Sequence, residues 1–310
     1  MSNIEVDHFG PWVIEISEDD PPPPLFLPYL TRLEEPTLSI KIPRNIEHRH
    51  ARPGMNLYDY LVALYRYDMV ILQRSGDTAI EHTYQYRDIQ YLSYSENLLK
   101  GNLRLGLREV IFDLPFNTVS SREMERLAAL IRERYCTAPD IVPALEEIPV
   151  PVEGLSFYFN GLLIKRDMAE PQFRLLAAQA NTPVASSEAS SLSELFFKVV
   201  GKTLLESMHF SDGRELKIVT RGQDYKYKWE AVYAKEYTYV PLENINGFRW
   251  QSDTRHTAVC RLLINTPAGP LSFVFTNDNA YIPIYSEFLE AVSSSFNQKE
   301  AFTLQQLNRI

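Results

Sequence analysis

Cysteine is scarce in this sequence of 310 residues. Its two cysteines, Cys136 and Cys260, lie far apart and have no second metal-ligating residue nearby. A disulfide framework needs several paired cysteines, and a structural zinc site needs clustered ligands. The sequence therefore predicts neither, and we expect no metal or other cofactor. Such sparse cysteine is typical of a reducing compartment, so we expect a cytoplasmic protein.

Long apolar runs and glycine-rich loops are also missing. No segment approaches 18 uninterrupted apolar residues, so we expect no transmembrane segment. The first residues, MSNIEVDHFG, are acidic and lack an apolar stretch, unlike a signal peptide. With 12 glycines, phosphate-cradling loops are scarce, and the motifs G-x-x-x-x-G-K-[ST], G-x-G-x-x-G and G-x-S-x-G do not occur. An enzyme is disfavoured, although a site assembled between two domains stays an alternative.

Positive charge is in deficit. The formal net charge is −9, with 31 Lys and Arg against 40 Asp and Glu. This balance argues against a nucleic-acid binder, because such proteins carry basic surfaces that neutralise phosphates. His48 and His50 are close enough in sequence to share a metal on a strand. However, Arg49 separates them and no third ligand is nearby, so we favour an exposed basic loop.

Proline and aromatic residues, by contrast, are plentiful: 20 Pro, 18 Tyr and 16 Phe, and the aromatics favour β structure. Residues 1–50 form a proline-rich, acidic N-terminal arm, in which Pro21 to Pro24 must be extended. One interpretation is a docking segment for an aromatic groove. The interpretation that we favour is an arm that packs its apolar side chains on a neighbouring domain. These side chains are Leu25, Phe26, Leu27 and Tyr29.

Residues 51–136 are predicted to form several strands and then one helix. The stretch DMVILQRSGDTAIEHTYQY predicts a hairpin with its turn at Gly76, and RDIQYLSYSENLL and NLRLGLREVIFDL predict further strands. Ser120 and Glu123 have the spacing of a capping box, which indicates a helix start. The predicted helix buries one stripe, made of Met124, Leu127, Ala128, Ile131 and Tyr135.

After a proline-rich linker at residues 137–153, residues 154–296 repeat this order. Asn160-Gly161 between two apolar runs predicts a hairpin. A second capping box, Ser191 to Glu194, favours a helix that stops at Gly201, with a strand as the alternative. An Asp212-Gly213 turn and several strands follow, and residues 297–310 form a C-terminal tail. The closing helix buries a stripe of Tyr281, Tyr285, Phe288, Val292 and Phe296.

A meander closed by one C-terminal helix resembles the pleckstrin-homology-like fold, and it occurs twice here. The stretches YRDIQYLSY and LENINGFRW correspond, with Ile89 against Ile245. Several bacterial proteins of unknown function are similar, some with tandem copies. The resemblance covers residues 55–135 and 195–296 and implies an α+β, mainly β chain of two PH-like barrels. The first half offers five strands where the fold has seven; residues 38–42 or 58–67 are candidates for the rest. A β-sandwich with appended helices is the alternative.

One cluster of basic residues lies in KIVTRGQDYKYKWE and comprises Lys217, Arg221, Lys226 and Lys228. In pleckstrin-homology domains that bind phosphoinositides, basic residues on the first two strands surround such a loop, and this cluster is similar. The resemblance implies a site for an anionic lipid or phosphate headgroup. Asp224 and Glu230 flank the cluster, and we favour an ordinary solvated strand face.

The pattern as a whole favours a non-enzymatic binding or scaffold protein that acts through protein–protein contacts or self-association. The first alternative is a peripheral binder of anionic headgroups through the basic cluster. The second alternative is an enzyme with an interdomain site, for which the sequence offers no catalytic residue.

Overall fold

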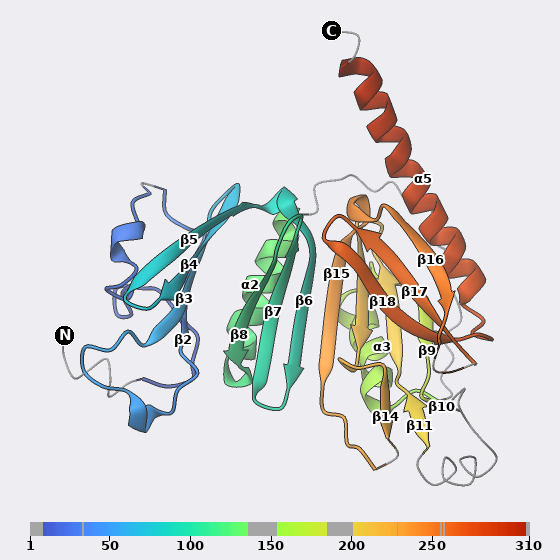
Figure 1. Ribbon diagram of the computed structural model, residues 1–310, viewed down its shortest axis with the longest axis horizontal. Coiled ribbons are helices and arrows are strands. Elements are labelled where there is room, and N and C mark those ends of the chain that lie inside the picture. The colour runs from blue at the N-terminus through green and yellow to red at the C-terminus, as the bar shows by residue number, and fades with distance from the viewer. Residues whose placement is uncertain are drawn as a thin grey trace. The chain divides into compact units, whose positions relative to one another are not determined.

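The computed structural model describes residues 9–32, 34–135, 154–184, 201–227, 229–254, 256 and 258–307, and it describes side chains at these positions except 165–167 and 296–307. The chain divides into two compact units, residues 1–136 and residues 137–310, here called unit 1 and unit 2 (Figure 1). The fold is mainly β, with several antiparallel sheets and a C-terminal helix. No helix of the described residues is both long and apolar enough for a membrane span.

Unit 1 begins with a five-stranded antiparallel sheet in which sequential strands are neighbours. The hairpin predicted around Gly76 is confirmed, and Gly76 takes a φ of +64°, which glycine adopts without a Cβ clash. Residues 38–43 of the predicted N-terminal arm belong to this sheet and pair with the next strand. The strands are β1 (Ile14–Glu15), β2 (Leu38–Pro43), β3 (Tyr58–Leu64), β4 (Asp68–Ser75) and β5 (Thr78–Gln85).

The proline-rich arm packs on unit 1, as expected for most of its apolar residues. Phe26 is fully buried in the core, and Leu25 and Tyr29 pack against the same cluster. The Tyr29 hydroxyl also accepts a hydrogen bond from the Ala79 amide at 3.3 Å. Leu27 was expected to pack with them, and this was wrong, because its side chain is exposed. The arm is thus part of the core rather than a free docking segment.

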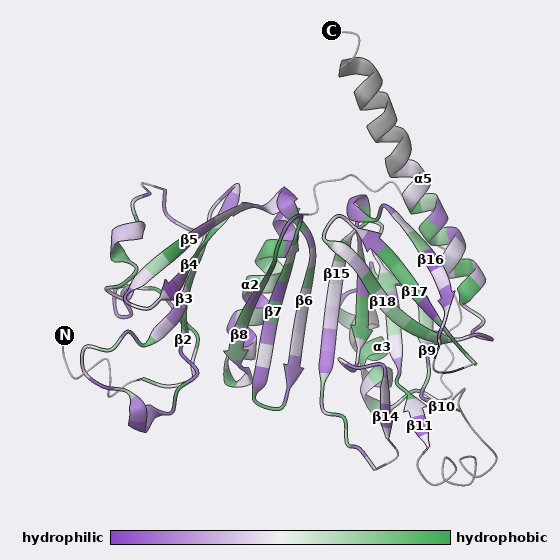
Figure 2. Cartoon of the chain, viewed as in Figure 1, coloured by the Kyte–Doolittle hydropathy of each residue, from purple (hydrophilic) through white to green (hydrophobic). Residues whose placement is uncertain are grey.

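Three further strands and a helix complete unit 1. The helix stripe predicted from Met124 to Tyr135 is confirmed, because all five of its side chains are buried. The Ser120 hydroxyl accepts a hydrogen bond from the Val13 amide at 2.8 Å, so this residue ties the start of the helix to the arm. The elements are β6 (Ile89–Asn97), β7 (Lys100–Leu107), β8 (Ile111–Asn117) and α2 (Ser121–Tyr135). In Figure 2, β7 alternates in hydropathy along its length, as expected for a strand with one face on the core.

Unit 2 holds three sets of antiparallel strands and two described helices. The Asp212-Gly213 turn is confirmed, with Gly213 at a φ of +87°. The first set pairs in the order β9 (Arg174–Gln179), β12 (Ser207–Ser211), β13 (Glu215–Thr220) and β15 (Lys235–Pro241). The second set is β10 (Thr182–Val184), β11 (Lys202–Leu204) and β14 (Tyr225–Tyr227). The third set is β16 (Gly247–Ser252), β17 (Val259–Thr266) and β18 (Gly269–Thr276).

The closing helix of unit 2, α5 (Ile282–Leu307), and the residue before it bury the described part of the predicted stripe. Tyr281, Tyr285, Phe288 and Val292 are all buried, whereas the side chain of Phe296 lies outside the described residues. Figure 1 shows the first part of α5 alongside β16, and the contacts between these two elements agree.

The hairpin predicted at Asn160-Gly161 was wrong, because this segment is helix α3 (Phe157–Ala169). Phe159 is fully buried on the inner face, and Tyr158 forms a hydrogen bond to the Tyr237 hydroxyl at 2.9 Å. These tertiary contacts override the turn preference of an Asn-Gly pair. The helix predicted from Ser191 to Gly201 and the linker at 137–153 lie outside the described residues, apart from Gly201 itself.

The strands of neither unit close into a continuous barrel within the described part of the chain. Each unit contains a set of four or more antiparallel strands, which is followed along the chain by a three-stranded meander. A helix follows the meander in both units.

Candidate functional site

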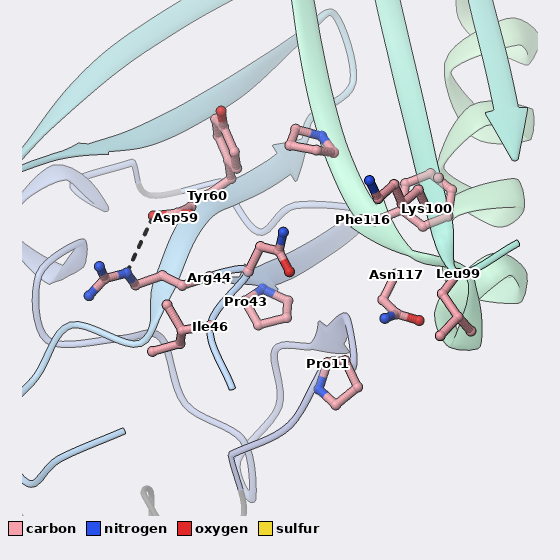
Figure 3. Close-up of a pocket in the computed structure, with 13 residues that line it drawn as sticks. Pro11, Pro43, Arg44, Ile46, Asp59, Tyr60, Leu99, Lys100, Phe116 and Asn117 are labelled. Atoms are coloured by element: carbon pink, nitrogen blue, oxygen red, sulfur yellow. Dashed lines mark ion pairs between the residues drawn. The ribbon is translucent and has the colours of Figure 1, made fainter. Parts of the chain in front are cut away.

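Unit 1 contains a cavity of about 310 Å³ that is open to the surface (Figure 3). Four parts of the chain surround it: Pro11, the end of β2 with the loop after it, the start of β3, and the ends of β6–β8. The lining residues are Pro11, Pro43, Arg44, Asn45, Ile46, Asp59, Tyr60, Leu99, Lys100, Gly101, Pro115, Phe116 and Asn117. We call this cavity the cleft.

The walls of the cleft combine rigid apolar groups with polar ones. Pro11, Pro43 and Pro115 contribute three rings with fixed backbone φ angles. The ring of Phe116 lies over Gly101, where a Cβ atom would come within 2.3 Å of it, so only glycine leaves room for this ring. Tyr60 packs edge-to-face on Phe112 with 6.2 Å between ring centres, and its burial raises the pKa of its hydroxyl. Such walls favour a ligand with apolar groups.

The charged groups of the cleft leave a surplus of positive charge. Its one carboxylate, on Asp59, accepts hydrogen bonds from Arg74, which lies outside the lining, with the nearest pair at 2.7 Å. The Arg44 Nε atom is 3.9 Å from the same carboxylate (Figure 3). Lys100 is exposed at the mouth and forms no ion pair among the described residues. The lining therefore holds two cations, Arg44 and Lys100, and one carboxylate, which a third cation, Arg74, also contacts.

An apolar rim adjoins the cleft. We define the rim as Trp12, Leu98, Leu99 and Val119, which are 53%, 67%, 63% and 52% exposed. Hydrogen bonds of Thr118, which precedes Val119, hold the Leu98-Leu99 turn, and the Val13 amide, next to Trp12, donates to the Ser120 hydroxyl at 2.8 Å. The Thr118 hydroxyl donates to the Leu98 carbonyl at 2.7 Å, and its amide donates to the Leu99 carbonyl at 3.2 Å. The patch is thus a fixed surface, unlike single apolar residues scattered over a protein.

Leu98 occupies an unfavourable backbone conformation. It is the first residue of the two-residue β6–β7 turn, with Asn97 paired to Lys100, and its φ is +54°. Glycine, asparagine or aspartate is usual at such a position. A leucine there costs about 1–2 kcal/mol because its Cβ crowds the following carbonyl oxygen. Unfavourable backbone and an exposed apolar side chain at the same residue indicate a role other than folding.

The predicted basic residues are engaged in separate places of unit 2. Lys217, on β13, forms an ion pair with Glu170, and its ammonium lies 5.0 Å from the centre of the Phe173 ring. Arg221 donates to the Val232 carbonyl and lies over the Tyr158 ring at 5.1 Å. These contacts hold both cations against their own unit.

Of the other two predicted basic residues, the structure describes only Lys226, which belongs to a different set of strands. Lys226 is on β14, paired with Thr203, whereas Lys217 is on β13. Lys228 lies outside the described residues. Near Lys226, the exposed rings of Tyr227 and Trp229 stack with 5.3 Å between centres and 7° between planes. The structure therefore places Lys226 on a different strand set from Lys217, next in sequence to a stacked aromatic pair.

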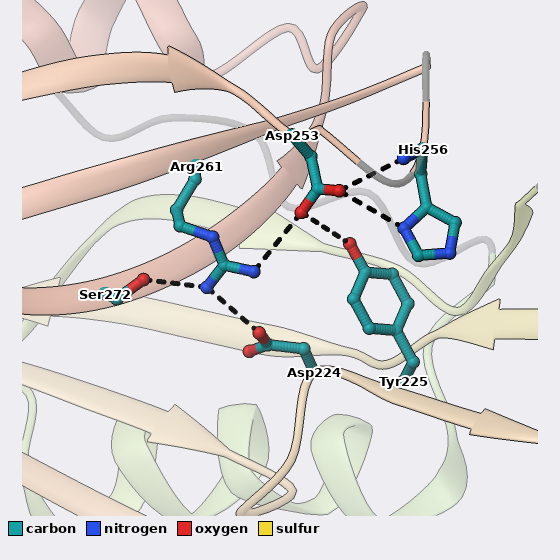
Figure 4. Close-up of polar contacts among 6 residues, drawn as sticks. All are labelled: Asp224, Tyr225, Asp253, His256, Arg261 and Ser272. Atoms are coloured by element: carbon teal, nitrogen blue, oxygen red, sulfur yellow. Dashed lines mark hydrogen bonds and ion pairs between the residues drawn. The ribbon is translucent and has the colours of Figure 1, made fainter. Parts of the chain in front are cut away.

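A polar cluster in unit 2 is centred on the buried carboxylate of Asp253 (Figure 4). Arg261 donates to this carboxylate at 3.3 Å, to Asp224 at 3.1 Å and to the Ser272 hydroxyl at 2.8 Å. The His256 amide and Nδ1 also contact Asp253, at 3.1 and 3.3 Å.

Tyr225 completes this cluster: it stacks on the His256 ring and donates to Asp253 at 3.4 Å. Burial, followed by the nearby Asp253, raises the pKa of Tyr225. The cluster pins the loop between β16 and β17 onto β14. Its groups satisfy one another, so its role is structural.

The cleft and the rim were not predicted from the sequence, because the residues that form them come from separate segments spread between positions 11 and 119. His48 and His50 are exposed, as expected for a basic loop, and the described residues contain no group of three or more metal-ligating side chains. No protein-family model matches this sequence, and a search of curated proteins gave no match.

Proposed function

We propose that this chain is a non-enzymatic scaffold that binds a partner protein through the cleft and the rim of unit 1. The main support for this proposal is the rim, whose four large apolar side chains are each more than half exposed beside an open cavity. Large apolar side chains that are gathered and exposed in this way are typical of an interaction site, since their contact with water is unfavourable until a partner covers them.

The backbone of Leu98 supports the same proposal. A glycine in its place would adopt this φ without the cost that a Cβ atom adds, and its φ and exposure give no reason from folding for a leucine here. Leu99 and Val119 flank it on a surface fixed by Thr118. A rigid apolar surface binds with little loss of conformational entropy, which favours a specific protein contact.

The order of elements supports a tandem PH-like architecture as the framework of this scaffold. In unit 1, apart from the two-residue β1, the strands β2–β5 precede β6–β8 and α2, which gives seven longer strands and one helix. Both candidate stretches for the missing strands, residues 38–42 and 58–67, contribute one, as β2 and β3. In unit 2, β9, β12, β13 and β15 precede β16–β18 and α5.

The test is affinity purification of the tagged chain from the cells that produce it, with quantitative mass spectrometry. Leu99→Glu places a charge in the rim, and Ile80→Glu is the matched control, since Ile80 is an exposed apolar residue of the same unit outside the rim and cleft. We expect at least one partner protein to be recovered with the wild-type chain and with the Ile80→Glu control, and to be lost with Leu99→Glu. Recovery of the same proteins by all three would contradict the proposal.

A second candidate, a peripheral binder of anionic headgroups, is favoured by the stacked Tyr227 and Trp229. Lys202 lies 5.4 Å from the Tyr227 ring centre, and Lys226 is the neighbouring residue. Exposed Trp and Tyr next to lysine are typical of surfaces that sit at a membrane interface. The test is flotation with anionic and neutral vesicles at low and physiological salt. Binding to anionic vesicles that Trp229→Ala and Lys226→Glu each abolish would support this candidate, and no binding at low salt would remove it.

A further inference from the structure

From the chemistry of the cleft, we propose that it takes an extended peptide segment of the partner that carries a carboxylate between apolar residues. This inference rests on the proposed function and names the partner's chemistry at the same site.

The charge of the cleft selects for an acidic group. Arg44 shares the Asp59 carboxylate with Arg74, and the lining offers no second carboxylate for Lys100, so the cleft carries more positive than negative charge. The chain as a whole has a net charge of −9, which repels an acidic segment from most of its surface. A locally positive cleft on an acidic protein therefore sets both where such a segment binds and in what register.

The size of the cleft selects for a chain rather than a small molecule. A volume of about 310 Å³ is at the lower end for ligand pockets, about 300–1,000 Å³. A small acid enclosed there would leave Leu98, Trp12 and Val119 uncovered, because these three rim residues do not line the cavity. A peptide instead places one acidic side chain in the cleft and lays its apolar neighbours across the rim.

The edge of strand β8 excludes recognition by strand addition. Hydrogen bonds join Leu107 to Val110 and Thr118 to Leu99, at the two ends of the β7–β8 ladder. Because hydrogen-bonded pairs alternate along an antiparallel ladder, the N–H and C=O groups of residues 111, 113, 115 and 117 on β8 point away from β7. Residue 115 is a proline without an N–H, which interrupts any added ladder at the cleft. Side chains of the peptide must therefore carry the recognition.

A probe with this chemistry is available in the chain's own sequence. Residues 143–152 read PALEEIPVPV, two glutamates between apolar residues and prolines. The experiment is fluorescence anisotropy of this labelled decapeptide against the charge-reversed PALKKIPVPV, titrated with the full chain. A second full chain carrying Glu146→Lys and Glu147→Lys removes any competition by the same residues in cis.

We expect the acidic peptide to bind at least one of these two proteins and the lysine peptide to bind neither. Lys100→Glu should weaken binding about tenfold, and rising salt should weaken it as well. Arg87→Glu, which reverses an exposed charge of unit 1 outside the cleft, should leave it unchanged. Leu99→Ser should weaken binding while preserving its salt dependence.

The outcomes separate this inference from the proposed function. If neither protein binds the acidic peptide, or if Lys100→Glu has no effect, the inference is overturned. The proposed function still stands in that case if Leu99→Glu abolishes recovery of a partner from cells. Conversely, the acidic peptide could bind while no cellular partner is lost with Leu99→Glu. That result would refute the proposed scaffold function and would leave the cleft as a site that binds acidic peptides.

Discussion

The Nδ1 atom of His209 lies 2.9 Å from the hydroxyl oxygen of Tyr285, which joins β12 to α5 in the core of unit 2. Both side chains are fully buried, and the rings of Phe273 and Phe275 lie 5.1 Å from the His209 ring. Burial lowers the pKa of His209 to about 3 and raises the pKa of Tyr285 well above its usual value. Both partners are therefore neutral at neutral pH, and Nε2 of His209 has no partner among the described residues.

The stability of unit 2 should fall on acidification because of His209. Its pKa is near 6.5 in the unfolded chain and about 3 in the folded one, so the unfolded state takes up the proton first. The stabilisation is complete above pH 6.5 and is lost as pH falls from 6.5 towards 3, by up to about 1.4 kcal/mol per pH unit. Urea unfolding between pH 4 and 8 measures this slope.

His209→Gln is the control, because glutamine keeps hydrogen-bonding atoms near Tyr285 but does not titrate. The variant should be less stable than the wild type at pH 7 and should lose less stability on going to pH 4.5. Parallel pH profiles for the two proteins would show that another group governs acid unfolding.

Leu98→Gly should stabilise unit 1 while weakening its contact with a partner. The substitution removes the cost of a leucine at a φ of +54°, and the greater freedom of glycine in the unfolded chain offsets part of the gain. A net increase of up to about 1 kcal/mol in the free energy of unfolding is expected. Thermal unfolding and partner recovery measure the two effects. A loss of stability would mean that the leucine side chain supports the fold.

Gly161→Ala should stabilise helix α3 by about 0.5–1 kcal/mol, because alanine is the better helix former. A Cβ atom at Gly161 meets nothing within 4 Å, so no clash opposes the gain. Gly76→Ala is the matched change at a turn with a φ of +64°, where a Cβ atom also meets nothing but the backbone is strained for alanine. It should destabilise unit 1. Thermal unfolding of both variants should therefore show shifts of opposite sign.

The sequence predicted elements well wherever a local pattern decided the structure. The helix stripe ending at Tyr135 and the turns at Gly76 and Gly213 follow from periodicity and turn chemistry alone. The helix around Gly161 was missed because burial of Phe159, a tertiary effect, outweighs the Asn-Gly turn signal. Within the described residues, local pattern thus gave the turns and the helix stripes, and tertiary packing overrode it around Gly161.

The candidate site was beyond a local pattern, because the cleft joins Pro11, Pro43 and Pro115 from three distant segments. One local signal was present. Leu98-Leu99 occupies a two-residue hairpin loop, where polar or small residues are usual, and an apolar pair at such a loop marks a surface with another purpose. The basic cluster was predicted from spacing, which cannot show that Lys217 is paired with Glu170.

Asp253→Ala should destabilise unit 2 far more than Asp224→Ala, although both carboxylates bind Arg261. The Asp253 side chain is 3% exposed, and its loss leaves buried donors of Arg261, Tyr225 and the His256 amide without an acceptor. Breaking such a buried pair costs roughly 3 kcal/mol. The Asp224 side chain is 38% exposed, so its pair contributes about 1 kcal/mol or less. Urea unfolding of the two variants tests the difference, and equal losses would mean that the network around Asp253 is not the element that fixes the β16–β17 loop.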